Sequence, residues 1–132
     1  MNLAGLTMRI ARPTDQLEAV GAFYRDGLGL PELSRFMDHA GFDGIILGFP
    51  GGPWHLELTH ARGHQVGGAP NADHLLTFYF PGEGAREQVI ERLQSQGHAP
   101  VVSLNPYWDD HGVSFADPDG YRVVLHRGAW SR

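Results

Sequence analysis

The chain lacks cysteine altogether, so disulfide bonds and thiol catalysis are excluded. It also lacks an apolar run of about 18 residues, the length that suggests a membrane-spanning helix. Its first residues, MNLAGLTMRIARPTD, do not have the basic and apolar regions of a signal peptide. With 132 residues the chain has the size of one ordinary domain. We therefore expect a soluble, cytoplasmic protein with no membrane partner.

Clusters of basic residues are also missing. The ten Lys and Arg residues are scattered among fifteen Asp and Glu residues, and the net charge is −5. Nucleic-acid-binding domains usually carry a basic patch or stripe, so this composition predicts no nucleic-acid partner. Eight histidines are the compositional feature that can carry chemistry, because imidazole binds metal ions and exchanges protons near neutral pH.

Glycine and proline are abundant, with 18 and 9 residues, which predicts many turns and short elements. The turn signals divide the chain into two halves that repeat one order of elements. The first half has a strand at 8–12, a helix capped by Thr14 or Asp15, and strands at 32–38, 44–49 and 54–60. The second half has a strand at 74–80, a helix at 83–96, and strands near 99–104, 113–117 and 121–126. The sequence predicts an α+β fold of two βαβββ modules, 6–60 and 73–128, joined by a polar, glycine-rich linker at 61–72.

Three segments carry a resemblance to a known family: FYRDGLGL in the first half, HLELTH at its end, and DPDGYRVVL at the end of the second half. Together with the paired modules, they resemble the vicinal oxygen chelate superfamily, which includes glyoxalase I, bleomycin- and fosfomycin-resistance proteins and extradiol dioxygenases. The resemblance implies a single glyoxalase-like domain over 1–132. It also implies the glyoxalase/bleomycin-resistance/dihydroxybiphenyl-dioxygenase fold, in which two curved mixed sheets form a cleft. Such a fold does not by itself define a function.

The resemblance also implies where metal ligands would lie, at Met8, Glu57, His74 and Val124. Only Glu57 and His74 have side chains that bind a hard or borderline metal ion, whereas catalytic metal sites usually have three protein ligands. The family metal site is therefore expected to be incomplete.

A third ligand can be sought by strand alternation, because residues two apart share a face. His55 shares a face with Glu57, and His126 shares one with Val124. Glu57 and His74 with either histidine would form a set of two imidazoles and one carboxylate, which suits Zn, Ni, Mn or Fe. Glu57 would then also be the candidate catalytic base.

Other residues are candidates for binding a substrate. The resemblance implies that Arg12 holds a substrate carboxylate, a task that suits a guanidinium group, and alternation would put Arg12 on the face of Met8; the alternative is a surface arginine near a turn. Tyr107 and Trp108, in a predicted loop, would close over a ligand or stack on a cation. The remaining candidates for lining or filling the cleft are Trp54, Phe78 and Val124.

Two functions stay open on this evidence. The missing ligands and the acidic charge favour a protein that binds a small molecule in its cleft without a metal, as bleomycin-resistance proteins do. Glu57, His74 and the neighbouring histidines favour a metal-dependent lyase or isomerase of the glyoxalase type, or an extradiol-type dioxygenase. A ligand-free interaction domain is a third reading. The resemblance further implies a symmetric homodimer.

Overall fold

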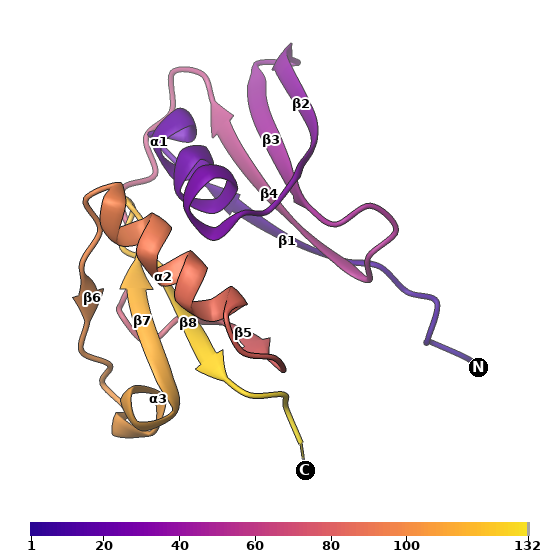
Figure 1. Cartoon of the computed structure of the whole chain (residues 1–132). Coiled ribbons are helices and arrows are strands. Elements are labelled where there is room, and N and C mark those ends of the chain that lie inside the picture. Colours follow the sequence, from indigo (N-terminus) through magenta and orange to yellow (C-terminus); the bar gives the residue numbers. More distant parts are fainter. Residues whose placement is uncertain (132) are drawn as a thin grey trace. The chain divides into compact units, whose positions relative to one another are not determined.

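The computed structural model describes residues 1–131 and divides the chain into two compact units (Figure 1). Unit 1 is Met1–Gly67 and unit 2 begins at Gly68, so their boundary lies inside the predicted linker. Each unit contains a four-stranded mixed sheet, with strand order β1-β4-β3-β2 in unit 1 and β5-β8-β7-β6 in unit 2. The predicted α+β fold of two βαβββ modules is confirmed.

Unit 1 follows the predicted order of elements. They are β1 (Met8–Pro13), α1 (Leu17–Ala22), the π-helical turn η1 (Phe23–Leu28), β2 (Glu32–His39), β3 (Phe42–Gly48) and β4 (Trp54–Ala61). The predicted N-cap at Thr14 or Asp15 is wrong, because the helix begins at Leu17 after Gln16. The carboxylate of Asp15 instead accepts hydrogen bonds from the linker amides of Val66 and Gly67. Asp15 thus fastens the linker to the end of β1.

The core of unit 1 lies between α1 and the sheet, since α1 packs against β3 and β4. Leu56 and Leu58 of β4 are buried on the side that faces the helix, and their register partners Leu47 and Ile45 of β3 are buried with them. The approach is close at Gly21, where an added Cβ would lie 2.8 Å from Cδ1 of Ile45. Because side chains alternate along β4, the face that carries Glu57 points away from α1.

Unit 2 differs from the prediction in two places. Its elements are β5 (Leu75–Phe80), α2 (Ala85–Ser95), β6 (Pro100–Val101), α3 (Pro106–His111), β7 (Gly112–Ala116) and β8 (Arg122–Arg127). The strand predicted near 99–104 is reduced to β6, and the predicted loop around Tyr107 and Trp108 is instead the helix α3. Asn105 caps α3, because its Oδ1 accepts a hydrogen bond from the amide of Tyr107, and Pro106 occupies the first helical position.

The core of unit 2 forms where α2 packs against β8. Val89 and Leu93 of α2 are buried, as are Val123 and Leu125 of β8. The turn DPDG leads into β8: Oδ1 of Asp117 accepts hydrogen bonds from the amides of Asp119 and Tyr121. Gly120 has φ of 94°, a conformation that glycine adopts without strain. The turn is therefore a structural connector that leads into β8.

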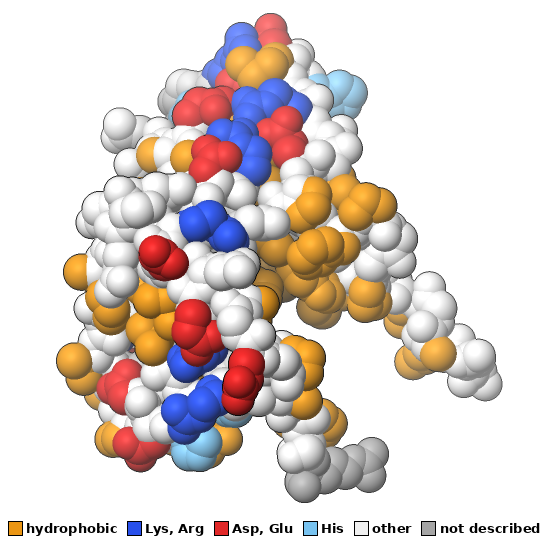
Figure 2. All heavy atoms as spheres, viewed as in Figure 1, with side chains coloured by type: hydrophobic (Ala, Val, Ile, Leu, Met, Phe, Trp, Pro, Cys, Tyr) orange, Lys and Arg blue, Asp and Glu red, His pale blue; other side chains and the backbone are white. Residues whose placement is uncertain are grey.

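Charged side chains of both signs lie next to one another over unit 1 on the face that Figure 2 shows. Unit 1 contains ion pairs of Arg25 with Asp26 and Glu32, and of Arg35 with Glu18 and Glu32. Among residues 1–131, no helix is both long and apolar enough to cross a membrane.

Candidate functional site

The polar face of unit 1 is organised by an arginine. In the parallel pairing of β1 with β4, Arg9 lies opposite His55 and Ala11 opposite Glu57. Nε of Arg9 donates a hydrogen bond to Nε2 of His55 at 2.8 Å, and its Nη1 donates to Oε2 of Glu57 at 3.2 Å. The side chain of Glu57 is 15% exposed and that of Arg9 is 48% exposed. One guanidinium group therefore bridges a carboxylate and an imidazole.

The β1 residues expected on this face lie on the other one. Met8 is the register partner of Trp54, and Arg12 that of Leu58, so these side chains lie on the side of the sheet that faces α1. Nη1 of Arg12 donates a hydrogen bond to the Tyr24 hydroxyl at 3.3 Å. The prediction that Met8 and Arg12 lie on the polar face is thus wrong. The residue next to Met8, Arg9, lies there instead, because neighbouring residues of a strand point to opposite faces.

On unit 2, the face that points away from α2 carries Val124 and His126. Their register partners in β5 are Thr77 and Tyr79, while Leu75 pairs with Arg122. Val124 is fully buried and His126 is 7% exposed.

Two predicted site residues of unit 2 do not belong to this face. Phe78 pairs with Leu125, so it lies on the side of the sheet that faces α2. His74 comes immediately before Leu75, and its ring centroid is 6.4 Å from that of Tyr121, the residue before Arg122. Alternation therefore separates His74 and Phe78 from Val124 and His126.

The residues of neither unit fit the implied metal ion. In unit 1, the candidate ligands Glu57 and His55 are both hydrogen-bonded to the cationic group of Arg9. In unit 2, His74 is exposed and precedes β5, His126 is buried within β8, and Val124 has no ligating atom. Within residues 1–131, no group of three or more His, Asp or Glu side chains is placed to hold a metal ion.

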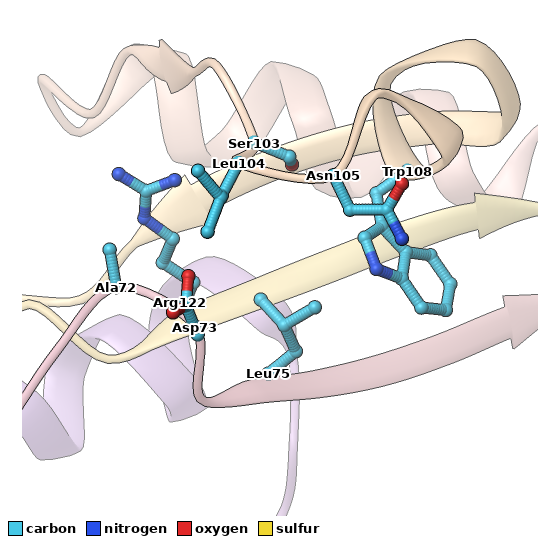
Figure 3. A pocket seen from close by; sticks show the side chains of 8 residues that line it. All are labelled: Ala72, Asp73, Leu75, Ser103, Leu104, Asn105, Trp108 and Arg122. Carbon is cyan, nitrogen blue, oxygen red and sulfur yellow. The ribbon is translucent and has the colours of Figure 1, made fainter.

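Unit 2 instead contains a pocket of about 230 Å³, which we call the Trp108 pocket (Figure 3). It lies on the same face as Val124, because Leu75 and Arg122 belong to that face. Figure 3 shows Asp73 and Arg122 at one end, Trp108 at the other, and the aliphatic side chain of Leu75 between them. Nη1 of Arg122 donates a hydrogen bond to the carbonyl of Val102 at 2.8 Å, which orients the guanidinium group. The lining residues are Ala72, Asp73, Leu75, Ser103, Leu104, Asn105, Trp108 and Arg122.

An aromatic cluster surrounds His126 beside this pocket. Its ring centroid lies 4.6 Å from that of Tyr79, 5.8 Å from His111, 6.2 Å from Trp108 and 6.3 Å from Tyr107. Tyr107 and His111 stack on each other at 4.1 Å. In the part of the chain that the structure describes, neither ring nitrogen of His126 has a hydrogen-bond partner. Of the predicted site residues, the structure thus gathers Tyr107, Trp108 and His126 in one place.

Several residues of the site were missed from the sequence. Arg9 was missed because the implied ligand position on the first strand is counted back from the residue that caps the helix. With Asp15 taken as that cap, the position falls on Met8, one residue before Arg9. Leu75, Leu104 and Asn105 of the pocket were missed because apolar or loop residues give no chemical signal. A signal for α3 was present, since Asn followed by Pro is typical of a helix start.

Comparison with known proteins gives consistent matches over both units. The YycE-like N-terminal domain model matches residues 8–59, and the YycE-like C-terminal domain model matches residues 73–127. The uncharacterized protein YycE of Bacillus subtilis is 41% identical over 118 residues, which cover 89% of this chain and 85% of that protein. A crystal structure of a YycE protein of unknown function from Bacillus subtilis is 38% identical with a TM-score of 0.85, covering 97% of this chain and 92% of that one.

More distant structures share the fold alone. The trypanothione-dependent glyoxalase I of Leishmania major is 17% identical with a TM-score of 0.69, covering 90% of this chain and 84% of that one. TnmS3, an antibiotic-binding protein from Streptomyces sp. CB03234, is 20% identical with a TM-score of 0.66, covering 98% of this chain and 99% of that one.

Proposed function

We propose that this chain, which belongs to the YycE-like family within the vicinal oxygen chelate superfamily, binds a small organic molecule in the Trp108 pocket without a metal ion. The observation that carries the proposal is the pocket itself, in which aliphatic side chains lie between Arg122 at one end and the indole of Trp108 at the other. Apolar walls with a few polar groups are typical of small-molecule sites.

The size of the pocket limits the ligand. Sites for drug-sized ligands usually enclose about 300–1,000 Å³, whereas the Trp108 pocket encloses about 230 Å³. A ligand of one or two rings fits this volume. The indole of Trp108 offers a face or edge to such a ring, and Arg122 offers a cationic end, partly balanced by Asp73.

The alternative function is that of a metal-dependent lyase, isomerase or dioxygenase. The positions of its candidate metal ligands do not favour it. Its proposed ligand Glu57 pairs with Arg9, and its second ligand His74 is an exposed residue that precedes β5 and lies beside the ring of Tyr121. The shared fold with an antibiotic-binding protein supports the binding function, since it shows that this architecture can serve binding. The homodimer and the cytoplasmic location remain predictions.

A screen of one-ring and two-ring compounds by amide NMR tests this proposal. Compounds that bind should shift the signals of residues lining the Trp108 pocket. The informative variant is Leu104→Lys, because Leu104 lines the pocket although it is 77% exposed, so that the fold should tolerate the change. Val102→Lys is the matched control, since Val102 is 82% exposed and is not a lining residue.

We expect Leu104→Lys to weaken binding about tenfold, the equivalent of losing the apolar contact of one leucine. Val102→Lys should bind as the unchanged chain does. The proposal is contradicted if no compound of the panel shifts the pocket signals, or if the two variants bind equally well.

A further inference from the structure

We infer, building on the proposed function, that His126 is the hydrogen-bonding end of a second compartment behind Trp108, and that it binds a hydroxyl group on an aromatic ring of the ligand. The first step concerns the state of His126. It is 7% exposed, and neither of its ring nitrogens has a hydrogen-bond partner among the residues described. A buried polar group left in this state costs about 1–3 kcal/mol.

Buried polar side chains nearby show the usual arrangement. The hydroxyl groups of Ser103 and Ser114 lie 2.9 Å apart and satisfy each other. Ser114 and His126 belong to the same face of the sheet, where Ser114 is the register partner of Val124. Because buried polar groups in native proteins nearly always have a partner, the exception at His126 calls for an explanation. A ligand atom that completes the hydrogen bonding is the explanation that fits a residue beside a pocket.

The second step concerns what separates His126 from the pocket. Trp108 lines the Trp108 pocket, and the same indole meets the His126 ring nearly edge-on, at an interplanar angle of 78°. In Figure 3 the indole projects from α3 over the sheet at the end of the pocket opposite Arg122. A movement of this one side chain would therefore join the pocket to the surroundings of His126.

The third step concerns the helix that carries Trp108. α3 has six residues, none of them buried. Isolated helices of this length are not stable in water, so α3 depends on its attachments. Those attachments include hydrogen bonds, in which the Asp109 carboxylate accepts from the amide of Ser103 and the carbonyl of Asp110 accepts from Arg127. They also include the ring contacts of Tyr107, Trp108 and His111 with His126. A segment held in this way can shift without disturbing the core beneath α2.

The final step is the chemistry of the ligand. The groups facing His126 are the rings of Tyr79 from β5 and of Tyr107, Trp108 and His111 from α3. Such walls favour an aromatic ring at centroid distances of about 4.5–7 Å. A neutral imidazole has one donor and one acceptor nitrogen, and a hydroxyl group can pair with either. A carboxylate would carry a charge into these aromatic surroundings at a much higher desolvation cost.

Phenol and toluene form the test pair, because they differ by a hydroxyl in place of a methyl group. We expect phenol to bind at least tenfold more tightly than toluene and to shift the His126 ring nitrogens in spectra of protein labelled at histidine. His126→Phe keeps an aromatic ring and removes the nitrogens, so the preference for phenol should disappear while toluene binding persists. His74→Phe is the matched control and should keep the preference, since His74 is exposed and lies on the opposite face.

The outcomes separate this inference from the proposed function. If both compounds shift the pocket signals equally and the His126 nitrogens do not respond, the inference is overturned and the proposed function stands. The same holds if His126→Phe keeps the preference for phenol. If neither these probes nor any compound of the wider panel binds, both fail. Should His126→Phe not fold, the nitrogen shifts in the unchanged protein decide.

Discussion

The polar face of unit 1 and the corresponding face of unit 2 are built on the same strand order but hold opposite kinds of side chains. When Glu57 of β4 is matched with Val124 of β8, the strand registers match Arg9 with Leu75 and His55 with Arg122. In unit 1 these positions form a hydrogen-bonded set of guanidinium, imidazole and carboxylate. In unit 2 two of the three positions are aliphatic, and His126 is a buried polar residue of this face whose ring nitrogens have no hydrogen-bond partner among the described residues.

The difference shows how one βαβββ module can pair its polar side chains with one another while its repeat leaves a buried imidazole unpaired. Arg9 already satisfies Glu57 and His55, so a ligand would have to compete with existing hydrogen bonds there. On unit 2 the Trp108 pocket and the unpaired nitrogens of His126 offer apolar area and hydrogen bonds that no described residue uses. This difference is our reason for proposing that unit 2 binds the ligand.

The largest effect that we expect from testing this comparison of the two faces is a gain of metal binding in unit 1. Arg9→His removes the guanidinium group and places a third ligand beside His55 and Glu57. We expect NiCl₂ or ZnCl₂ to stabilise this variant by about 2.7 kcal/mol at a free concentration one hundred times the Kd. The measurement is the melting temperature with and without the metal.

Met8→His is the matched control, because Met8 is the neighbouring residue on the α1 side of the sheet. It adds a histidine without completing the set, so its melting temperature should respond no more than that of the unchanged protein. An equal response in both variants would show that added histidine alone is responsible. No response in Arg9→His would show that Arg9 does not occupy a ligand position.

A smaller effect separates the two histidines. His126→Phe removes nitrogens that have no partner, so we expect the free energy of unfolding to rise by about 1 kcal/mol. His55→Phe removes the acceptor of Arg9 and should lower the free energy of unfolding by about 0.5–1 kcal/mol. Urea denaturation at neutral pH measures both. Loss of stability in both variants would mean that His126 is as well satisfied as His55, and the comparison would fail.

The sequence was sufficient for the order of the strands and of α1 and α2, because their hydrophobic periodicity and turn residues are local signals. The apolar alternation of β4 predicted correctly that Leu56 and Leu58 share a face opposite Glu57. Local signals did not predict which residues of β1 lie on the polar face, because that prediction depended on where the helix begins. Asp15 resembles a helix cap, but it binds the linker amides of Val66 and Gly67, and the helix begins at Leu17.

The pocket was harder to predict than the strands. Its walls come from segments that adjoin only after folding, namely Asp73 and Leu75, the stretch 103–105, Trp108 and Arg122. The prediction that residues 107 and 108 contact a ligand rested on residue type alone, because both are large aromatic side chains in a segment that was predicted to be a loop. Their helical conformation followed from Asn105 and Pro106, a capping signal that was overlooked.

The smallest effect expected is a difference in acid sensitivity between the units. Unit 1 contains four carboxyl groups whose pKa is lowered: Asp15 by the amide of Val66, Asp26 by Arg25, Glu32 by Arg35 and Asp43 by Arg62. Among the described residues of unit 2, Glu87 is the carboxyl group with a lowered pKa, through a hydrogen bond from its own amide. A lowered pKa in the folded state stabilises the fold fully above the ordinary value of about 4, and this contribution is lost as the pH falls through the lowered value.

Acidification should therefore loosen unit 1 before unit 2. Amide hydrogen exchange between pH 5 and pH 3, corrected for the intrinsic rate, measures this: protection of β1 to β4 should fall earlier than protection of β5 to β8. Asp43→Asn should reduce the difference, because the amide keeps its acceptor oxygen for Arg62 but does not titrate. The effect is small because these groups lie near solvent. Simultaneous loss of protection in both units would show that their ion pairs do not distinguish them.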